Sequence, residues 1–102
     1  MKSEFHTLLE KEIESRLNSL RTRSYNELAD FKELVSDRIM INKKPVIIST
    51  WKDITKDNKL RVVVQAYRPV ILGFGFMRAN GFLIDEHNNV KDLKRDELYE
   101  FV

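Results

Sequence analysis

The stretch from Leu60 to Ile84 limits how this chain can fold more than any other feature of its sequence. It is mostly apolar, and it contains all three glycines of the chain. Fully extended, Leu60 to Met77 alone would span about 60 Å at roughly 3.3 Å per residue, whereas a compact domain of this size has a radius of gyration of only about 13 Å. One straight strand cannot fit. We therefore predict a turn or a strong kink between Tyr67 and Val70, where Pro69 has no N–H to donate to a sheet.

From Pro45 onward the chain is rich in β-branched and aromatic residues, which predict an antiparallel sheet. Asn80-Gly81 predicts a tight hairpin, because both residues tolerate positive φ. A last hairpin is expected at Asn88-Asn89, and a two-residue turn there would place Asp85 opposite Asp92. Asp92 is also placed to cap a short terminal helix. The expected strands are Val46–Ile54, Leu60–Arg68, Val70–Arg78, Phe82–Glu86 and a return through Val90–Leu93, with a turn over Thr55–Lys59.

An amphipathic helix of about five turns is expected before this sheet. Its apolar residues recur at three- and four-residue spacing, and mostly charged residues occupy the positions between them. Ser3 is placed to act as its N-cap. The apolar stripe, which would lie flat on a sheet, consists of Phe5, Leu8, Leu9, Ile13, Leu17 and Leu20.

A second, shorter helix is predicted from about Tyr25 to Ser36. Ser24 and Glu27 have the spacing of a capping box, in which the hydroxyl accepts from the third helical amide and the carboxylate reaches back. Its apolar stripe would be Leu28, Phe31, Leu34 and Val35. The sequence does not decide the structure of the segment that follows, because Ile39–Ile41 fits either a short strand or a tucked loop.

The expected fold is a single α+β domain over residues 1–102, with two layers. A long N-terminal helix, with the second helix beside it, packs on a curved antiparallel sheet of four to five strands. A helix followed by a curved meander resembles the cystatin and nuclear-transport-factor-like layouts. Members of those families often dimerise through the sheet or hold a pocket between helix and sheet, so the resemblance implies one of these two uses.

Composition narrows the classes of function. A formal net charge of +2 over 102 residues is too small to imply a nucleic-acid or membrane partner. The chain has no cysteine, which excludes disulfides, thiolate metal sites and cysteine nucleophiles, and we expect no cofactor. The N-terminal residues lead into a helix rather than the apolar block of a secretory signal, and no run has the roughly 18 apolar residues of a membrane span. We therefore expect a cytoplasmic protein.

Gly73–Met77 resembles the ribonucleoprotein signature of RNA-recognition-motif domains and the glycine-phenylalanine strand of cold-shock domains. In those families aromatic side chains on a sheet stack against bases, so the resemblance implies single-stranded nucleic-acid binding through Phe74 and Phe76. The sequence departs from the pattern at Leu72, where a basic residue is expected, and at Ala79, where an aromatic one is expected. The alternative interpretation is a core strand whose glycines allow close backbone approach.

Counting along the strand of Val70–Met77 places apolar residues on both of its faces. A sheet with one wet side should alternate, so something must cover the second face. The chain's own second helix and tail, a symmetric partner subunit, or a ligand are the three alternatives. Trp51 and Tyr67 are expected to border this surface, since aromatic residues with a polar group suit interfaces. The candidate binding residues are Trp51, Tyr67, Phe74, Phe76 and Arg78.

The remaining polar residues favour no catalytic or metal site. His87 and its acidic neighbours match neither the spacing of a zinc site nor that of a calcium loop, and we expect no metal. The pair Asp85 and Asp92 would have one raised pKa, but no nucleophile or orienting group accompanies it. The densest basic group comprises Arg16, Arg21 and Arg23, with Lys43 and Lys44, and a solvated helix end explains its arginines.

The sequence therefore favours a small, non-catalytic binding or interaction module that self-associates through its sheet as a homodimer, or binds a protein partner. Single-stranded nucleic-acid binding is the alternative. A small-molecule site between helix and sheet is a third, weaker hypothesis.

Overall fold

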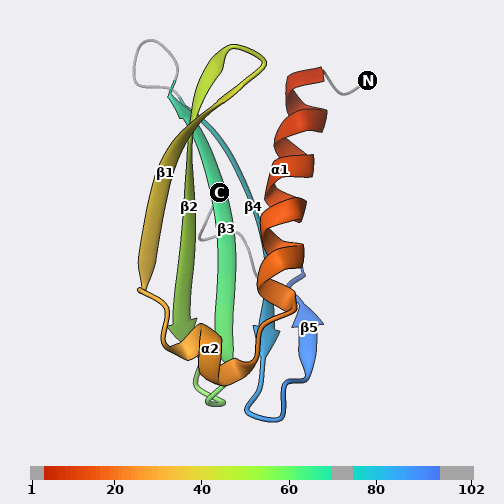
Figure 1. Ribbon diagram of the computed structural model, residues 1–102, viewed down its shortest axis with the longest axis vertical. Coiled ribbons are helices and arrows are strands. Elements are labelled where there is room, and N and C mark those ends of the chain that lie inside the picture. The colour runs from red at the N-terminus through yellow and green to blue at the C-terminus, as the bar shows by residue number, and fades with distance from the viewer. Residues whose placement is uncertain (1–3, 70–74, 95–102) are drawn as a thin grey trace.

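The computed structural model describes residues 4–69 and 75–94, and shows one long helix packed against a five-stranded antiparallel sheet (Figure 1). The strands follow one another in chain order, so β1 and β5 are the two edges of an open sheet. The expected α+β class is confirmed. None of the helices in these ranges is long and apolar enough to cross a membrane. The elements are α1 (Glu4–Arg21), α2 (Tyr25–Ala29), β1 (Leu34–Ile41), β2 (Lys44–Ile54), β3 (Leu60–Pro69), β4 (Gly75–Ile84) and β5 (Val90–Asp92).

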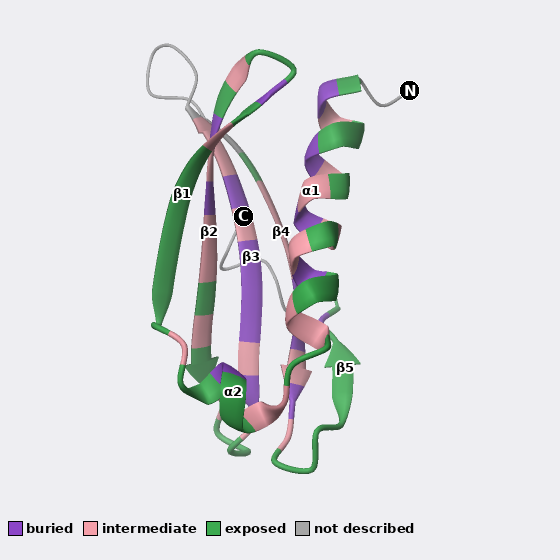
Figure 2. Cartoon of the chain, in the orientation of Figure 1, coloured by how far each residue is buried: buried purple, intermediate pink, exposed green. Residues whose placement is uncertain are grey.

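Helix α1 forms the second layer and confirms the long helix expected from the sequence. Its buried residues recur every fourth position, close to the 3.6-residue turn of a helix, and lie on one side. The helix lies across β3 and β4, and Figure 2 shows the buried residues along its length and along β3. We call the side of the sheet that α1 covers the inner face. The core joins Phe5, Leu9, Ile13 and Leu17 of α1 to Val46, Ile48, Val62, Val64, Ala66, Phe82 and Ile84 of that face. The expected cap, Ser3, lies outside the described residues.

The second helix is much shorter than predicted. Its start is correct, because Ser24 accepts from the Glu27 amide and Glu27 reaches back to the Ser24 amide as a capping box. The helix ends at Ala29, however, and Leu34–Ile41 is a strand. All eight residues of this strand pair with β2, around a turn at Asn42-Lys43 in which both residues have positive φ. Cross-strand pairing therefore outweighed a local helical spacing, and it also resolves the Ile39–Ile41 segment as strand.

Asn80-Gly81 is not a hairpin, which corrects a second expectation. β4 runs without interruption through both residues, with Asn80 opposite Val64 and Gly81 opposite Val63. Gly81 is required there by space, since a Cβ at this position would lie 2.4 Å from the Val62 carbonyl oxygen and 3.0 Å from a methyl carbon of Leu93. The dipeptide matched the turn signal, but the glycine serves a close approach between strands.

The chain does reverse direction near Pro69, but later than predicted. Tyr67 and Arg68 continue β3, and Pro69 pairs with Gly75 at the start of β4. β3 thus extends to Pro69 and its antiparallel partner β4 begins at Gly75, while residues 70–74 lie outside the described part of the chain.

The last hairpin differs from the expected one in its register. Ile84 pairs with Val90, and Asp92 lies opposite Phe82 rather than opposite Asp85. The proposed Asp85–Asp92 pair is therefore wrong, because the loop is longer than two residues and the Asp85 amide donates to the Asn89 carbonyl. The expected terminal helix lies outside the described residues.

Candidate interaction surface

The side of the sheet opposite α1, here called the outer face, is partly covered by the chain itself. Directly after β5 the Leu93 amide donates to the Gly81 carbonyl at 2.9 Å, which continues the pairing with β4 by one residue and places the Leu93 side chain on this face. Leu93 packs on Val63, with Ala79 and Leu83 beside it. Val63 is therefore buried on the outer face as its neighbours in β3 are on the inner face. The two apolar faces expected from the sequence belong to Val70–Met77, most of which lies outside the described residues, and Met77 on the outer face is 36% exposed, so that expectation stays a prediction.

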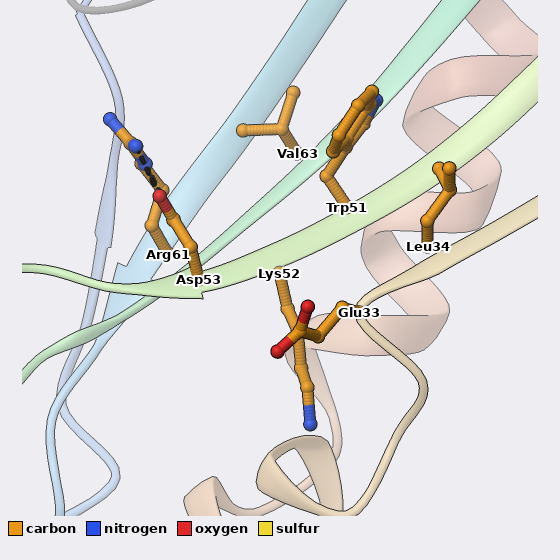
Figure 3. Close-up of a pocket in the computed structure, with 7 residues that line it drawn as sticks. All are labelled: Glu33, Leu34, Trp51, Lys52, Asp53, Arg61 and Val63. Atoms are coloured by element: carbon orange, nitrogen blue, oxygen red, sulfur yellow. Dashed lines mark hydrogen bonds and ion pairs between the residues drawn. The ribbon is translucent and has the colours of Figure 1, made fainter.

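An apolar hollow lies beside this covered centre, where β1, β2 and β3 begin or end. Leu34, Trp51 and Val63 are register neighbours on three adjacent strands, and Figure 3 shows their side chains on the same side of the sheet. The hollow has a volume of about 520 Å³. Leu34 is 47% exposed and Trp51 is 38% exposed, whereas Val63 is buried at its floor. Leu34 and Trp51 therefore expose apolar surface beside each other on adjacent strands.

The charged residues around the hollow are held by the protein. Arg61 and Asp53 form an ion pair across β2 and β3, with Nε donating to the carboxylate at 2.8 Å (Figure 3). Lys52 points away from Trp51 and toward α2, where its Nζ donates to the carbonyl oxygens of Leu28 and Ala29. The polar rim is therefore fixed in place, and Leu34 and Trp51 are the apolar side chains exposed for contact.

Strand β1 is the open side of this surface. Five residues from Leu34 to Arg38 are exposed in succession, and Met40 is 63% exposed. Among the described residues β1 pairs with β2 alone. The Lys52 amide donates to the Glu33 carbonyl, so odd-numbered residues direct their backbone groups to β2. The even-numbered residues of β1 therefore direct N–H and C=O outward, and these are Leu34, Ser36, Arg38 and Met40.

An ion pair ties β1 to α1. The Arg16 guanidinium donates to both carboxylate oxygens of Asp37, at 2.8 and 3.0 Å, and its Nε donates to Glu12 at 2.9 Å. The hydrogen bonds from Arg16 lower the pKa of the Asp37 carboxyl from its usual value. Asp37 lies on the inner face, so its charge is compensated although it sits in the middle of an edge strand.

The structure divides the residues that the sequence proposed for binding. Trp51 and Tyr67 share the outer face, where Tyr67 lies between Ile47 and Met77, and the Trp51 indole donates to Gln65 at 2.9 Å. Arg78 lies opposite Ala66 on the inner face, away from both aromatic residues. These residues therefore do not form one site.

Phe74 lies outside the described residues, and of Phe76 the structure describes only the backbone, which pairs with Arg68 in β4. Base stacking by these two phenylalanines consequently stays a prediction. The arginines of the basic group proposed from the sequence are paired with carboxylates: Arg16 pairs with Asp37, Arg21 with Glu14 and Asp92, and Arg23 with Glu27.

The turn at Asp85 is held by hydrogen bonds of its own. Asp85 accepts from the amides of His87 and Asn89, both at 2.9 Å, and these bonds, led by that of Asn89, lower the pKa of its carboxyl. No group of three or more metal-binding side chains occurs within residues 4–69 and 75–94. The carboxylate thus has a local structural role in the turn.

The space between α1 and the sheet is filled by the apolar core described above. A hollow of about 200 Å³ lies at the C-terminal end of α1, lined by Arg16, Arg23, Phe31 and Thr50 among others. The packed core argues against the small-molecule site proposed between helix and sheet.

Comparison with protein-family models, curated proteins and solved structures finds no match to this chain.

The sequence did not reveal β1 as a surface element. Its residues alternate poorly, since Leu34 and Val35 are both apolar and Asp37 and Arg38 are both charged. The available signal was the short polar turn of Asn42-Lys43 between two β-branched segments, which is typical of a hairpin. A hairpin predicted at Asn42-Lys43 would have placed Leu34 and Met40 on the edge of the sheet.

Proposed function

We propose that this protein is a non-catalytic interaction module that self-associates through its sheet, with β1 as the contact strand. One observation carries the proposal: β1 is an eight-residue edge strand that is exposed along most of its length and directs four residues' backbone groups outward. Such an edge is a template for pairing with another strand, and natural proteins usually shorten or cover it.

The other edge of the sheet supports the choice of β1. β5 has only three residues, and its Asp92 is bound by Arg21 of α1. β1 is longer, and its exposed apolar residues Leu34, Val35 and Met40 would be buried in a dimer. The edge of β1 carries adjacent charges at Asp37 and Arg38, but Arg16 already pairs with the first of them.

The test is the mass in solution, with one substitution at the edge. Light scattering across micromolar concentrations should give twice the 12.1 kDa of the chain. Ser36→Pro removes an outward N–H without breaking a bond to β2, so we expect a folded monomer. Ser36→Ala is the matched control, because it also loses the hydroxyl contact with Ser49 but keeps the N–H. It should remain a dimer.

A wild-type chain that is monomeric at every concentration would overturn the proposal. A Ser36→Pro variant that is folded by circular dichroism and still dimeric would also contradict it, since the contact would then lie elsewhere.

A further inference from the structure

We propose that two copies of the chain join through their β1 strands about a two-fold axis that passes through Asp37. This rests on the proposed self-association and specifies its register. Leu34 then lies opposite Met40 of the second copy, and Val35 lies opposite Ile39 of the second copy. The two sheets become one continuous antiparallel sheet, with α1 of both copies on the same side.

Geometry restricts the registers to a short list. A two-fold axis perpendicular to the sheet keeps inner and outer faces separate, so each residue must lie opposite one of the same parity. The axis therefore passes through a residue. Asp37 and Arg38 lie equally near the middle of β1, whose bounds are Leu34 and Ile41, so an axis at either residue gives the longest overlap.

The neighbouring registers place charges less favourably. With the axis at Ser36, Arg38 would lie opposite Leu34 of the second copy, and Asp37 opposite Val35. With the axis at Arg38, two guanidinium groups would meet. Like charges directly opposite one another are destabilising, and a charged side chain opposite an apolar one makes no favourable cross-strand contact. The axis at Asp37 instead pairs apolar residues with apolar residues on both faces.

The backbone groups fit the same register. Leu34, Ser36, Arg38 and Met40 direct N–H and C=O outward, as the Lys52–Glu33 hydrogen bond establishes by alternation. An axis at Asp37 sets Leu34 against Met40 and Ser36 against Arg38 of the second copy. Each of these pairs exchanges two hydrogen bonds, and Asp37 lies in a pair that exchanges none.

The cost of this register is that two Asp37 side chains meet at the axis. Each carboxylate already accepts two hydrogen bonds from Arg16 of its own chain, at 2.8 and 3.0 Å. The carboxylates therefore meet as two ion pairs rather than as bare charges, although Glu12 shares the same guanidinium. Arg16 becomes a residue on which the dimer depends.

The dimer would also complete the outer-face hollow. Leu34, Trp51 and Val63 form an apolar row that stops at the edge of β1. Met40 of the second copy would lie beside Leu34 and extend this row across the interface. Two exposed side chains, Leu34 at 47% and Met40 at 63%, would thereby cover each other.

The chain contains no cysteine, so disulfide trapping can read the register without interference. Val35 and Ile39 of the second copy would form a pair without backbone hydrogen bonds, at about 4.5 Å between Cα atoms, within the range that disulfides span. The double variant Val35→Cys/Ile39→Cys should form a covalent dimer on mild oxidation. Each single variant should stay uncrosslinked.

The outcomes separate the register from the proposed function. A dimer by light scattering whose double variant does not crosslink would overturn the register alone. Crosslinking by the single variant at Val35 or at Ile39 would place the axis on that residue and also overturn it. A chain that is monomeric throughout would overturn the self-association on which the register rests.

A second measurement does not depend on cysteine. Arg16→Met leaves two uncompensated Asp37 carboxylates at the axis, and we expect the dimer dissociation constant to rise about fivefold. The double variant Arg16→Met/Asp37→Asn should restore the wild-type constant, because the repulsion is gone. An Arg16→Met variant with an unchanged dissociation constant would contradict the axis at Asp37.

Discussion

At Gly81 the backbones of two strands and one side chain of the outer face come closer together than any side chain would allow. A Cβ there would meet the Val62 carbonyl oxygen at 2.4 Å, the Val63 Cα at 3.1 Å and a Leu93 methyl at 3.0 Å. This single position lets Leu93 reach Val63 and cover the centre of the outer face. The glycine thus leaves room for the Leu93 side chain against the outer face.

We expect Gly81→Ala to reduce the free energy of unfolding by about 1–3 kcal/mol, as for other substitutions that overpack a core. Urea unfolding followed by tryptophan fluorescence measures this loss. The double variant Gly81→Ala/Leu93→Ala should not recover it, because the shortest contact is with the backbone oxygen of Val62. Recovery in the double variant would show that only the contact with Leu93 matters.

At the scale of the elements, the segment from Ser24 to Ile41 shows which structural features can be predicted from the sequence and which cannot. The capping box of Ser24 and Glu27 is a local arrangement, and it was predicted correctly. The end of the helix at Ala29 was not, because the pairing of β1 with β2 is a contact that local spacing does not contain. The long helix α1 was predicted correctly because its apolar spacing is repeated over many turns. The spacing that suggested a longer α2 covered only a few residues and was not repeated.

The Arg16–Asp37 ion pair joins α1 to β1, and its effect should depend on pH. Folding lowers the pKa of Asp37 through its hydrogen bonds with Arg16, so the folded chain binds this proton less readily than the unfolded chain. The stabilisation is therefore complete above the usual value of 3.8 and disappears as the pH falls through the lower pKa of the folded state.

Urea unfolding at a series of pH values tests this dependence with Asp37→Asn. The wild type should exceed the variant by up to about 1 kcal/mol at neutral pH, since the pair is at the surface. The difference should shrink as the pH falls below the usual pKa of an aspartate. A difference that persists unchanged in acid would mean that Asp37 stabilises the fold through something other than its charge.

For the molecule as a whole, the sequence predicted the layers and missed the apolar hollow on the outer face. The α+β class and the helix stripe followed from patterns within single segments. The outer-face hollow depends on Leu34, Trp51 and Val63, which come from three strands and become neighbours only through the register. Trp51 was proposed as a binding residue because of its residue type, but no sequence pattern pointed to its neighbours Leu34 and Val63.

The two-layer arrangement makes a matched pair of predictions on α1. Leu17 is fully buried against the inner face, whereas Leu8, on the same helix and of the same type, is 37% exposed. Leu17→Ala should reduce the free energy of unfolding by about 2–5 kcal/mol, because it removes buried apolar contacts and leaves a cavity in the core. Leu8→Ala should change it by no more than about 0.5 kcal/mol.

Helix propensity changes equally in the two variants, so the difference between them in urea unfolding reports packing on the sheet alone. Equal losses would mean that α1 does not lie on the sheet by the side that carries Leu17.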